Sequence, residues 1–224
     1  MEKTILVTGK DTYLGNEIAR FFLDQGARVG ASVTPRQHEA TLSLDQDERL
    51  LTVPWYRNSA VSAKNLVWQT ANKLGTLNEV WVILTLEKDG IFLESPPAVL
   101  EEALDAGLKG LTFLTRELLS LQANNPALRI IFVLFEEDRN ELPPPLALIY
   151  QGAKGFITSV LAAARRKNLP IWAYESALPQ AEAYTQFLLA HPRGEAKAAP
   201  PGRWTVFEEK KTLLASLFPK RNDT

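Results

Sequence analysis

Short apolar runs and amphipathic stretches alternate along the chain. The apolar runs are rich in β-branched and aromatic residues and end at glycine, proline or charged residues, a pattern typical of strands. The predicted strands cover residues 4–7, 27–33, 49–53, 79–86, 128–135 and 170–174, with 202–207 as a possible seventh. The stretches between them carry apolar residues at helical spacing. The predicted helices cover residues 14–25, 59–75, 97–122, 146–167 and 180–190.

This alternation predicts the class of fold. Strands separated by helices of ten or more residues favour βαβ units and a parallel sheet. Right-handed crossovers then place helices on both faces of the sheet. With 224 residues, 46% of them hydrophobic, the chain is long enough to bury one large core. We therefore predict a single α/β domain over residues 1–224, with a three-layer, doubly wound Rossmann-type fold and a mostly parallel sheet of six to seven strands.

Composition and charge exclude several classes of function. The net charge of −1 provides no field that would attract nucleic acid or an anionic membrane. The absence of cysteine excludes disulfides, thiolate catalysis and cysteine metal sites. Neither His38 nor His191 has a metal-ligating partner at a suitable spacing, so no metal site is predicted. The apolar run at the N-terminus is too short for a secretory signal, and no segment approaches a membrane span of about 20 residues, so we expect a cytoplasmic protein without a membrane partner.

A glycine turn with the sequence GKDTYLG follows the first predicted strand. In doubly wound sheets the ligand lies beyond the carboxyl ends of the strands. Glycines there permit a tight turn and let the backbone approach a pyrophosphate at a helix N-terminus. The candidate cofactor-binding residues of this turn are Gly9, Thr12, Tyr13, Leu14 and Gly15.

Two questions stay open at this turn. Tyr13 stands where a third small residue is expected, so its ring either folds outward or fills the space of the phosphates. In addition, Gly9 and Gly15 equally suit a turn that serves only chain geometry and helix packing.

The end of the second predicted strand bears on the choice of cofactor. A dinucleotide-binding fold often carries an acidic residue there for the ribose hydroxyls, but this strand ends Ser32-Val33-Thr34. Arg36 lies just beyond and would suit a 2′-phosphate. If a cofactor binds, the sequence therefore favours NADP(H) over NAD(H). The alternative is that Arg36 is an ordinary surface arginine.

The segment LIYQGAKGF contains the main candidate for catalysis. Tyr150 and Lys154 are four residues apart on a predicted helix, so they share one face. A lysine ammonium beside a phenol favours the phenolate and lowers the pKa of the phenol. Such a tyrosine can act as a general acid or base near neutral pH.

Over nearly its whole length the sequence resembles the short-chain dehydrogenase/reductase family. TILVTGKDTYLGNEIARFFLDQGARV is similar to the family's first strand, glycine turn and first helix, and YQGAKGFITSVLAAARRKNLPIWAY to its active-site helix and sixth strand. The resemblance implies NAD(P)(H)-dependent interconversion of a carbonyl and an alcohol. Tyr150 would be the acid/base, and Lys154 would lower its pKa and hold the nicotinamide ribose. It also implies a homodimer or homotetramer formed through the helices at 97–122 and 146–167.

The sequence also departs from the family pattern. Besides Tyr13, residues 83–86 replace the family's Asn-Asn-Ala-Gly stretch, and Gly107 falls near the family's helix asparagine. The family's serine, which should polarise the carbonyl, falls among Glu136, Glu137 and Asp138. The loop that covers the substrate after the sixth strand is missing as well. A second hypothesis therefore stays open: a catalytically degenerate relative that serves as a nucleotide-sensing or protein-interaction scaffold.

Overall fold

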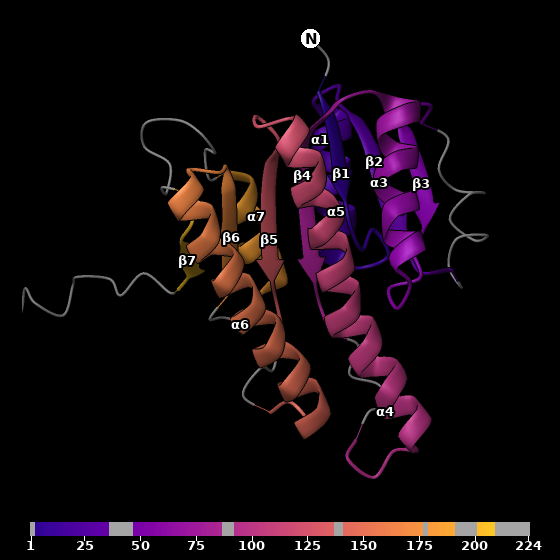
Figure 1. Ribbon diagram of the computed structural model, residues 1–224, viewed down its shortest axis with the longest axis vertical. Coiled ribbons are helices and arrows are strands. Elements are labelled where there is room, and N and C mark those ends of the chain that lie inside the picture. The colour runs from indigo at the N-terminus through magenta and orange to yellow at the C-terminus, as the bar shows by residue number, and fades with distance from the viewer. Residues whose placement is uncertain are drawn as a thin grey trace, which may run out of the picture.

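A single seven-stranded sheet forms the centre of the protein, as a computed structural model shows for residues 3–35, 47–86, 92–136, 141–176, 179–190 and 201–208 (Figure 1). The strands are β1 (Thr4–Val7), β2 (Arg28–Val33), β3 (Leu50–Pro54), β4 (Leu77–Leu84), β5 (Arg129–Leu134), β6 (Ile171–Ser176) and β7 (Trp204–Phe207). Their order is β3-β2-β1-β4-β5-β6-β7, and every neighbouring pair is parallel. The predicted doubly wound α/β fold is confirmed, with seven strands.

Helices cover both faces of this sheet (Figure 1). On one face, α3 (Ala60–Leu74), α5 (Gly110–Asn124) and α6 (Pro144–Lys167) pack over a core that includes Leu6 and Phe132. On the other face, α1 (Tyr13–Asp24) and α7 (Ala181–Ala190) pack over a second core. Because side chains alternate between the two faces of a strand, neighbouring residues of β5 enter different cores.

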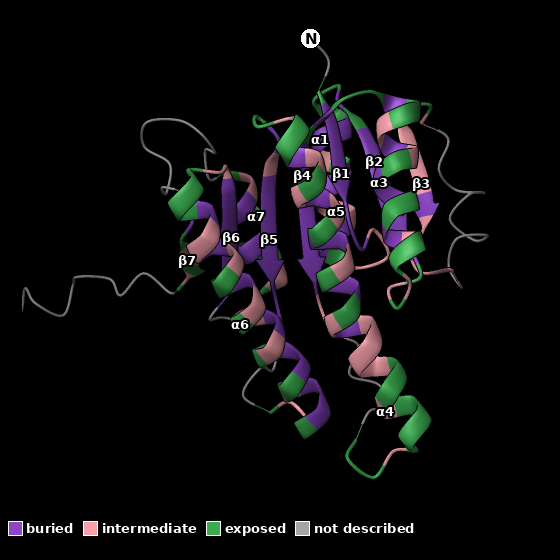
Figure 2. Cartoon of the chain, in the orientation of Figure 1, coloured by how far each residue is buried: buried purple, intermediate pink, exposed green. Residues whose placement is uncertain are grey.

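The predicted helix 97–122 is one helical run with an irregular turn inside it. It consists of α4 (Pro97–Leu104), the π-helical segment η1 (Asp105–Lys109) and α5. The α4 end extends past the sheet and none of its residues is buried (Figure 2). Single π turns inside α-helices interrupt the regular hydrogen-bond ladder. This one places Gly107 against α6, as described below.

The helix α6 qualifies the expectation that no segment of the sequence approaches a membrane span. Within the described part of the chain, it is the one helix long and apolar enough to cross a membrane, judged by length and composition alone. Helices that pack on a buried sheet can pass the same test, and α6 buries one face, from Pro145 to Ala164, against the sheet. Prolines in its first turn and three basic residues in its last turn suit the ends of a helix.

Candidate active site at the carboxyl edge of the sheet

The glycine turn lies between β1 and α1, where the order of the sheet reverses direction. Gly9 has a φ of +68°, a conformation that favours glycine. A Cβ at Gly15 would lie 1.9 Å from the carbonyl oxygen of Gly9, so α1 can approach the turn only with glycine there. Both glycines are therefore explained by backbone geometry, and their role in binding a cofactor stays a prediction.

Thr12 closes the turn and begins α1. Its hydroxyl donates to the Gly9 carbonyl at 2.7 Å and accepts from the Gly15 N–H at 3.2 Å. This is the side-chain cap that a helix N-terminus needs for its first N–H groups. The positive end of the α1 dipole is thereby held at the carboxyl edge of the sheet.

The turn is also bound to the end of β2. The Gly9 N–H donates to Ser32 Oγ at 3.0 Å, and the Asp11 carboxylate accepts from the Thr34 N–H at 2.8 Å. The second strand has no acidic residue of its own at its end, and the fold brings Asp11 there from the turn. Arg36 lies outside the described residues.

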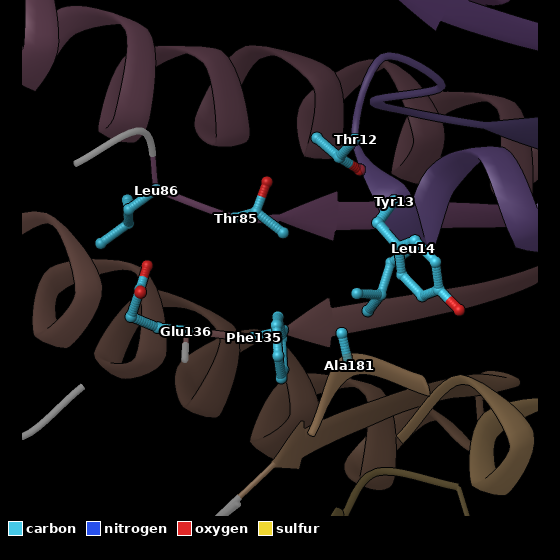
Figure 3. A pocket seen from close by; sticks show the side chains of 8 residues that line it. All are labelled: Thr12, Tyr13, Leu14, Thr85, Leu86, Phe135, Glu136 and Ala181. Carbon is cyan, nitrogen blue, oxygen red and sulfur yellow. The ribbon is translucent and has the colours of Figure 1, made fainter. Parts of the chain in front are cut away.

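A cavity of about 260 Å³ opens beside the turn (Figure 3). Its walls come from the β1–α1 turn, the residues after β4 and β5, and the start of α7. The lining residues are Thr12, Tyr13, Leu14, Thr85, Leu86, Phe135, Glu136 and Ala181. The cavity therefore lies at the topological switch point, where doubly wound sheets bind their ligands. Its volume is slightly below the roughly 300–1,000 Å³ of typical ligand pockets.

The ring of Tyr13 forms one wall of this cavity. The residue is 48% exposed, and Figure 3 shows its hydroxyl pointing away from Thr12 and Thr85. Partial desolvation and the nearby carboxylates of Glu182 and Glu17 raise the pKa of the Tyr13 phenol. The ring thus lies along the rim of the cavity and narrows it, with its hydroxyl outside.

Tyr150 and Lys154 share one face of α6, and both bind the carboxylate of Glu175 on β6. The Tyr150 hydroxyl donates to Glu175 Oε1 at 3.0 Å. The Lys154 ammonium lies 2.8 Å from the same oxygen and 2.7 Å from Oε2. Tyr150 is 2% exposed and Glu175 3% exposed, whereas the Lys154 side chain is 37% exposed. The spacing in the sequence predicted the pair but not Glu175, although an acidic residue at the end of an apolar strand was a usable signal.

A second tyrosine lies near this cluster, in the core on the other face of the sheet. Tyr184 of α7 is fully buried, and its hydroxyl donates to the Leu134 carbonyl at 3.5 Å. Burial raises the pKa of Tyr184 well above its ordinary value, and Tyr150 and Glu175 add to the effect. Neither Tyr150 nor Lys154 lines the cavity beside the glycine turn. The turn and the pair thus share one edge of the sheet without facing a common cavity.

Comparison with solved structures identifies the fold. No protein-family model matches the sequence, and no curated protein matches it either. A short chain dehydrogenase from Bacillus anthracis str. 'Ames Ancestor' superimposes with a TM-score of 0.73 at 15% identity, over 92% of this chain and 95% of that one. The chain has the fold of the short-chain dehydrogenases and reductases.

Two further solved structures agree with this assignment. Levodione reductase matches with a TM-score of 0.64 at 17% identity, over 78% of this chain and 70% of its own. A short-chain dehydrogenase/reductase, glucose/ribitol dehydrogenase, from Brucella melitensis matches with a TM-score of 0.60 at 21% identity, over 79% and 77% of the two chains. At these identities the likeness establishes the fold.

The positions that depart from the short-chain dehydrogenase pattern have their own packing. A Cβ at Gly107 would lie 2.4 Å from Cγ2 of Ile149, so η1 and α6 approach too closely for an asparagine side chain. Glu136 is buried and lines the cavity, whereas Glu137 and Asp138 lie outside the described residues. A carboxylate therefore stands at the cavity wall near the expected serine.

Arg57 is a candidate that the sequence analysis missed. Its guanidinium lies over the Trp55 ring, 5.3 Å from the centroid. Its Nη2 would lie 3.9 Å from a Cβ at Gly9, so a cation reaches the glycine turn from the loop after β3. The backbone of Arg57 packs on Gly110, where a Cβ would lie 2.9 Å from the Arg57 carbonyl oxygen. No local pattern in the sequence marks this residue.

No metal site was predicted, and the described residues contain no group of three histidine, aspartate or glutamate side chains that could hold a metal ion. His38 and His191 lie outside the described residues. The candidate site itself offers a phenol, an ammonium and a carboxylate group.

Proposed function

We propose that this protein is an NAD(P)(H)-dependent oxidoreductase that interconverts a carbonyl and an alcohol, with Tyr150 as acid/base and Lys154 as its electrostatic partner. The observation that carries the proposal is the Tyr150–Lys154 pair on α6, at the carboxyl edge of a short-chain dehydrogenase fold. This edge also carries the glycine turn and the cavity. A phenol beside an ammonium group can exchange a proton with a substrate oxygen near neutral pH.

The residues at the turn fit the phosphate-bearing part of a dinucleotide. The capped N-terminus of α1 favours an anion, and Arg57 brings a positive charge to Gly9. A cavity of about 260 Å³ holds only part of such a ligand, so the Tyr13 ring has to move for the remainder. The proposed cofactor residues are those that the sequence predicts, Gly9, Thr12, Tyr13, Leu14, Gly15, Arg36 and Lys154, together with Arg57.

The choice between NADP(H) and NAD(H) rests on two opposing charges. Arg36 favours a 2′-phosphate, as the sequence predicts. The Asp11 carboxylate at the Thr34 N–H opposes one, because a phosphate beside a carboxylate is repelled. We propose NADP(H) with the expectation that Asp11→Asn strengthens NADPH binding more than NADH binding.

In the reductive direction, a bound nicotinamide would supply a hydride to the carbonyl carbon. Tyr150 would give its proton to the carbonyl oxygen, after its hydroxyl leaves Glu175 Oε1. Lys154 would then stabilise the phenolate until water returns the proton. β6 ends at Ser176 and α7 begins at Ala181, so the connection between them is short in sequence.

Calorimetric titration of NADPH and NADH tests the proposal directly. Micromolar binding by the wild type, followed by carbonyl reduction that is lost in Tyr150→Phe, would support it. The variant Tyr13→Gly, titrated in parallel, should bind NADPH and NADH more tightly than the wild type, because the Tyr13 ring narrows the cavity. Binding without any reduction across a panel of aldehydes and ketones would reject catalysis.

A second candidate function is a catalytically degenerate scaffold that senses a nucleotide or binds a protein. One observation is consistent with it: the Tyr150 hydroxyl is buried, donates to Glu175 and does not reach the cavity. Absence of binding by the wild type, with binding recovered in Tyr13→Gly, would favour this candidate.

We also propose that the protein forms a homodimer or homotetramer through the helices at 97–122 and 146–167. A groove of about 470 Å³ between α5 and α6 supports this, because its walls are mostly apolar. Its lining residues include Leu119, Ala123, Phe156, Val160, Ala163 and Leu169. Sedimentation of Val160→Glu beside the wild type tests it: a fall to monomer is expected, and a wild-type monomer would contradict the proposal.

A further inference from the structure

The Glu175 carboxylate is shared by both members of the Tyr150–Lys154 pair. Oε1 accepts from the Tyr150 hydroxyl at 3.0 Å and from the Lys154 ammonium at 2.8 Å, while Oε2 lies 2.7 Å from the ammonium. A carboxylate can only accept, so the hydroxyl that binds it must keep its proton. The charge of Lys154, which would favour a phenolate, is matched by the charge of Glu175.

Neighbouring elements in the described part of the chain also carry titratable groups near this cluster. Tyr184 of α7 lies close enough to Tyr150 and Glu175 for both to raise its pKa further, after burial itself. Tyr174 precedes Glu175 on β6 and points to the opposite core. Because the pKa of Tyr184 is raised, its phenol is neutral near pH 7. The carboxylate that follows β5, Glu136, lines the cavity at the same edge of the sheet.

We propose that Glu175 is a positioning residue of the candidate active site, which holds the Tyr150 hydroxyl protonated and turned toward β6 until a substrate oxygen displaces it. Such a site is set to donate a proton. In alcohol oxidation, the Tyr150 phenolate must accept a proton from the substrate. This direction therefore requires a higher pH with Glu175 present than it would without Glu175. The catalytic consequence rests on the proposed function, but the effect on protonation does not.

The proton transfer that this arrangement governs is balanced by the proposed cofactor. The O–H bond of Tyr150 would break as the substrate O–H bond forms. A reduced nicotinamide, when bound, would supply the hydride and be oxidised as the carbonyl is reduced. Water would then return the proton to the phenolate, and the hydroxyl would bind Glu175 Oε1 again.

The ionisation of Tyr150 can be followed without any ligand. Tyrosines labelled with ¹³C at Cζ are titrated by NMR, and the Tyr150 signal is the one missing from Tyr150→Phe. In Glu175→Gln, Tyr150 should ionise at a pH lower than in the wild type by about one unit or more, because Lys154 then faces the phenol without a counter-charge. In Lys154→Met the ionisation should move to higher pH, because the carboxylate remains alone.

Matched variants separate this role from a general effect on folding. Glu175→Asp keeps the carboxylate and should titrate nearer the wild type than Glu175→Gln does. Glu182→Gln makes the same chemical change on the exposed start of α7 and should leave the Tyr150 signal unchanged. If Glu175→Gln does not fold, the double variant Glu175→Gln/Lys154→Met can be used, because it removes both charges together. Tyr150 should ionise at a lower pH in this double variant than in Lys154→Met, which keeps the carboxylate.

The outcomes distinguish this inference from the proposed function. An unchanged Tyr150 titration in Glu175→Gln, with the protein folded, would overturn the role of Glu175. The expected shift in a protein that binds neither NADH nor NADPH would reject the proposed function alone. If alcohol oxidation is found, its rate should rise with pH. In Glu175→Gln this rise should occur at a lower pH than in the wild type, by the same amount as the shift in the NMR titration.

Discussion

Two buried carboxylates, at opposite edges of the sheet, meet the same physical demand in different ways. Near the amino edge, Glu79 of β4 accepts from the Trp81 indole at 2.7 Å and lies 3.6 Å from the Arg129 guanidinium. At the carboxyl edge, Glu175 of β6 accepts from a phenol and an ammonium. Each carboxylate thus has one aromatic donor and one cation, because a buried charge needs both pairing and hydrogen bonds.

The difference lies in the aromatic donor. An indole N–H donates a hydrogen bond and does not titrate, so the aromatic member of the Glu79 cluster has no proton to exchange near neutral pH. A phenol can lose its proton, and the Glu175 cluster lies at the edge where doubly wound sheets bind ligands. Similar burial and similar partners therefore produce a structural cluster at one edge and a cluster capable of chemistry at the other.

The largest expected effect separates the two clusters by activity. If the proposed function holds, Tyr150→Phe should lower the rate of carbonyl reduction by roughly 10²–10⁴, the usual contribution of a general acid. Its free energy of unfolding should fall by only about 1–2 kcal/mol, because Lys154 still pairs with both oxygens of Glu175. Steady-state kinetics and urea unfolding of the same preparation measure both. A rate equal to that of the wild type would place the acid elsewhere.

The next largest effect concerns the contribution of the Glu79 cluster to stability. Trp81→Phe removes a donor to Glu79 and part of a ring that is fully buried. We expect a loss of about 2–4 kcal/mol in the free energy of unfolding by urea. Trp68→Phe is the matched control, because Trp68 is exposed, and should change stability by less than about 0.5 kcal/mol. Equal losses in the two variants would contradict the structural role of the Glu79 cluster.

The two cations offer a third comparison at equal exposure. The side chains of Lys154 and Arg129 are 37% and 35% exposed, and their partners Glu175 and Glu79 are 4% and 7% exposed. Lys154 is closer, at 2.7 Å against 3.6 Å. Lys154→Met should therefore cost about 1–2 kcal/mol and Arg129→Met about 1 kcal/mol or less, measured by urea unfolding. The reverse order would show that distance does not rank these two ion pairs.

The smallest effect at neutral pH concerns Tyr184, beside the Glu175 cluster. Burial raises the pKa of Tyr184 well above the ordinary 10.0, so its contribution to stability is complete below pH 10.0 and is lost as the pH rises above that value. Tyr184→Phe should cost less than about 1 kcal/mol at pH 7, because its hydrogen bond is 3.5 Å long. The variant should resist alkaline unfolding better than the wild type. Circular dichroism between pH 9 and about 12 measures the alkaline unfolding of both proteins. An identical transition in Tyr184→Phe and the wild type would contradict this account.

The sequence by itself determined the local parts of this protein. Apolar periodicity predicted the strands and helices, because burial of one face is a local property of each element. The φ of +68° at Gly9 favours a residue without Cβ, and glycine marks that turn in the sequence. Tyr150 and Lys154 could be paired in advance because residues four apart on a helix always share a face.

Only the tertiary structure decided what those parts contact. Glu175 meets Tyr150 because β6 pairs with β5 while α6 crosses over them, a contact between residues 25 positions apart. Likewise, Arg57 reaches Gly9, and Asp11 reaches the end of β2, through the order of strands in the sheet. Patterns in a sequence report which face of an element is buried, whereas the partner of a buried polar group depends on how distant elements are packed. For that reason the sequence named the phenol and the ammonium, and the fold supplied the carboxylate that holds them.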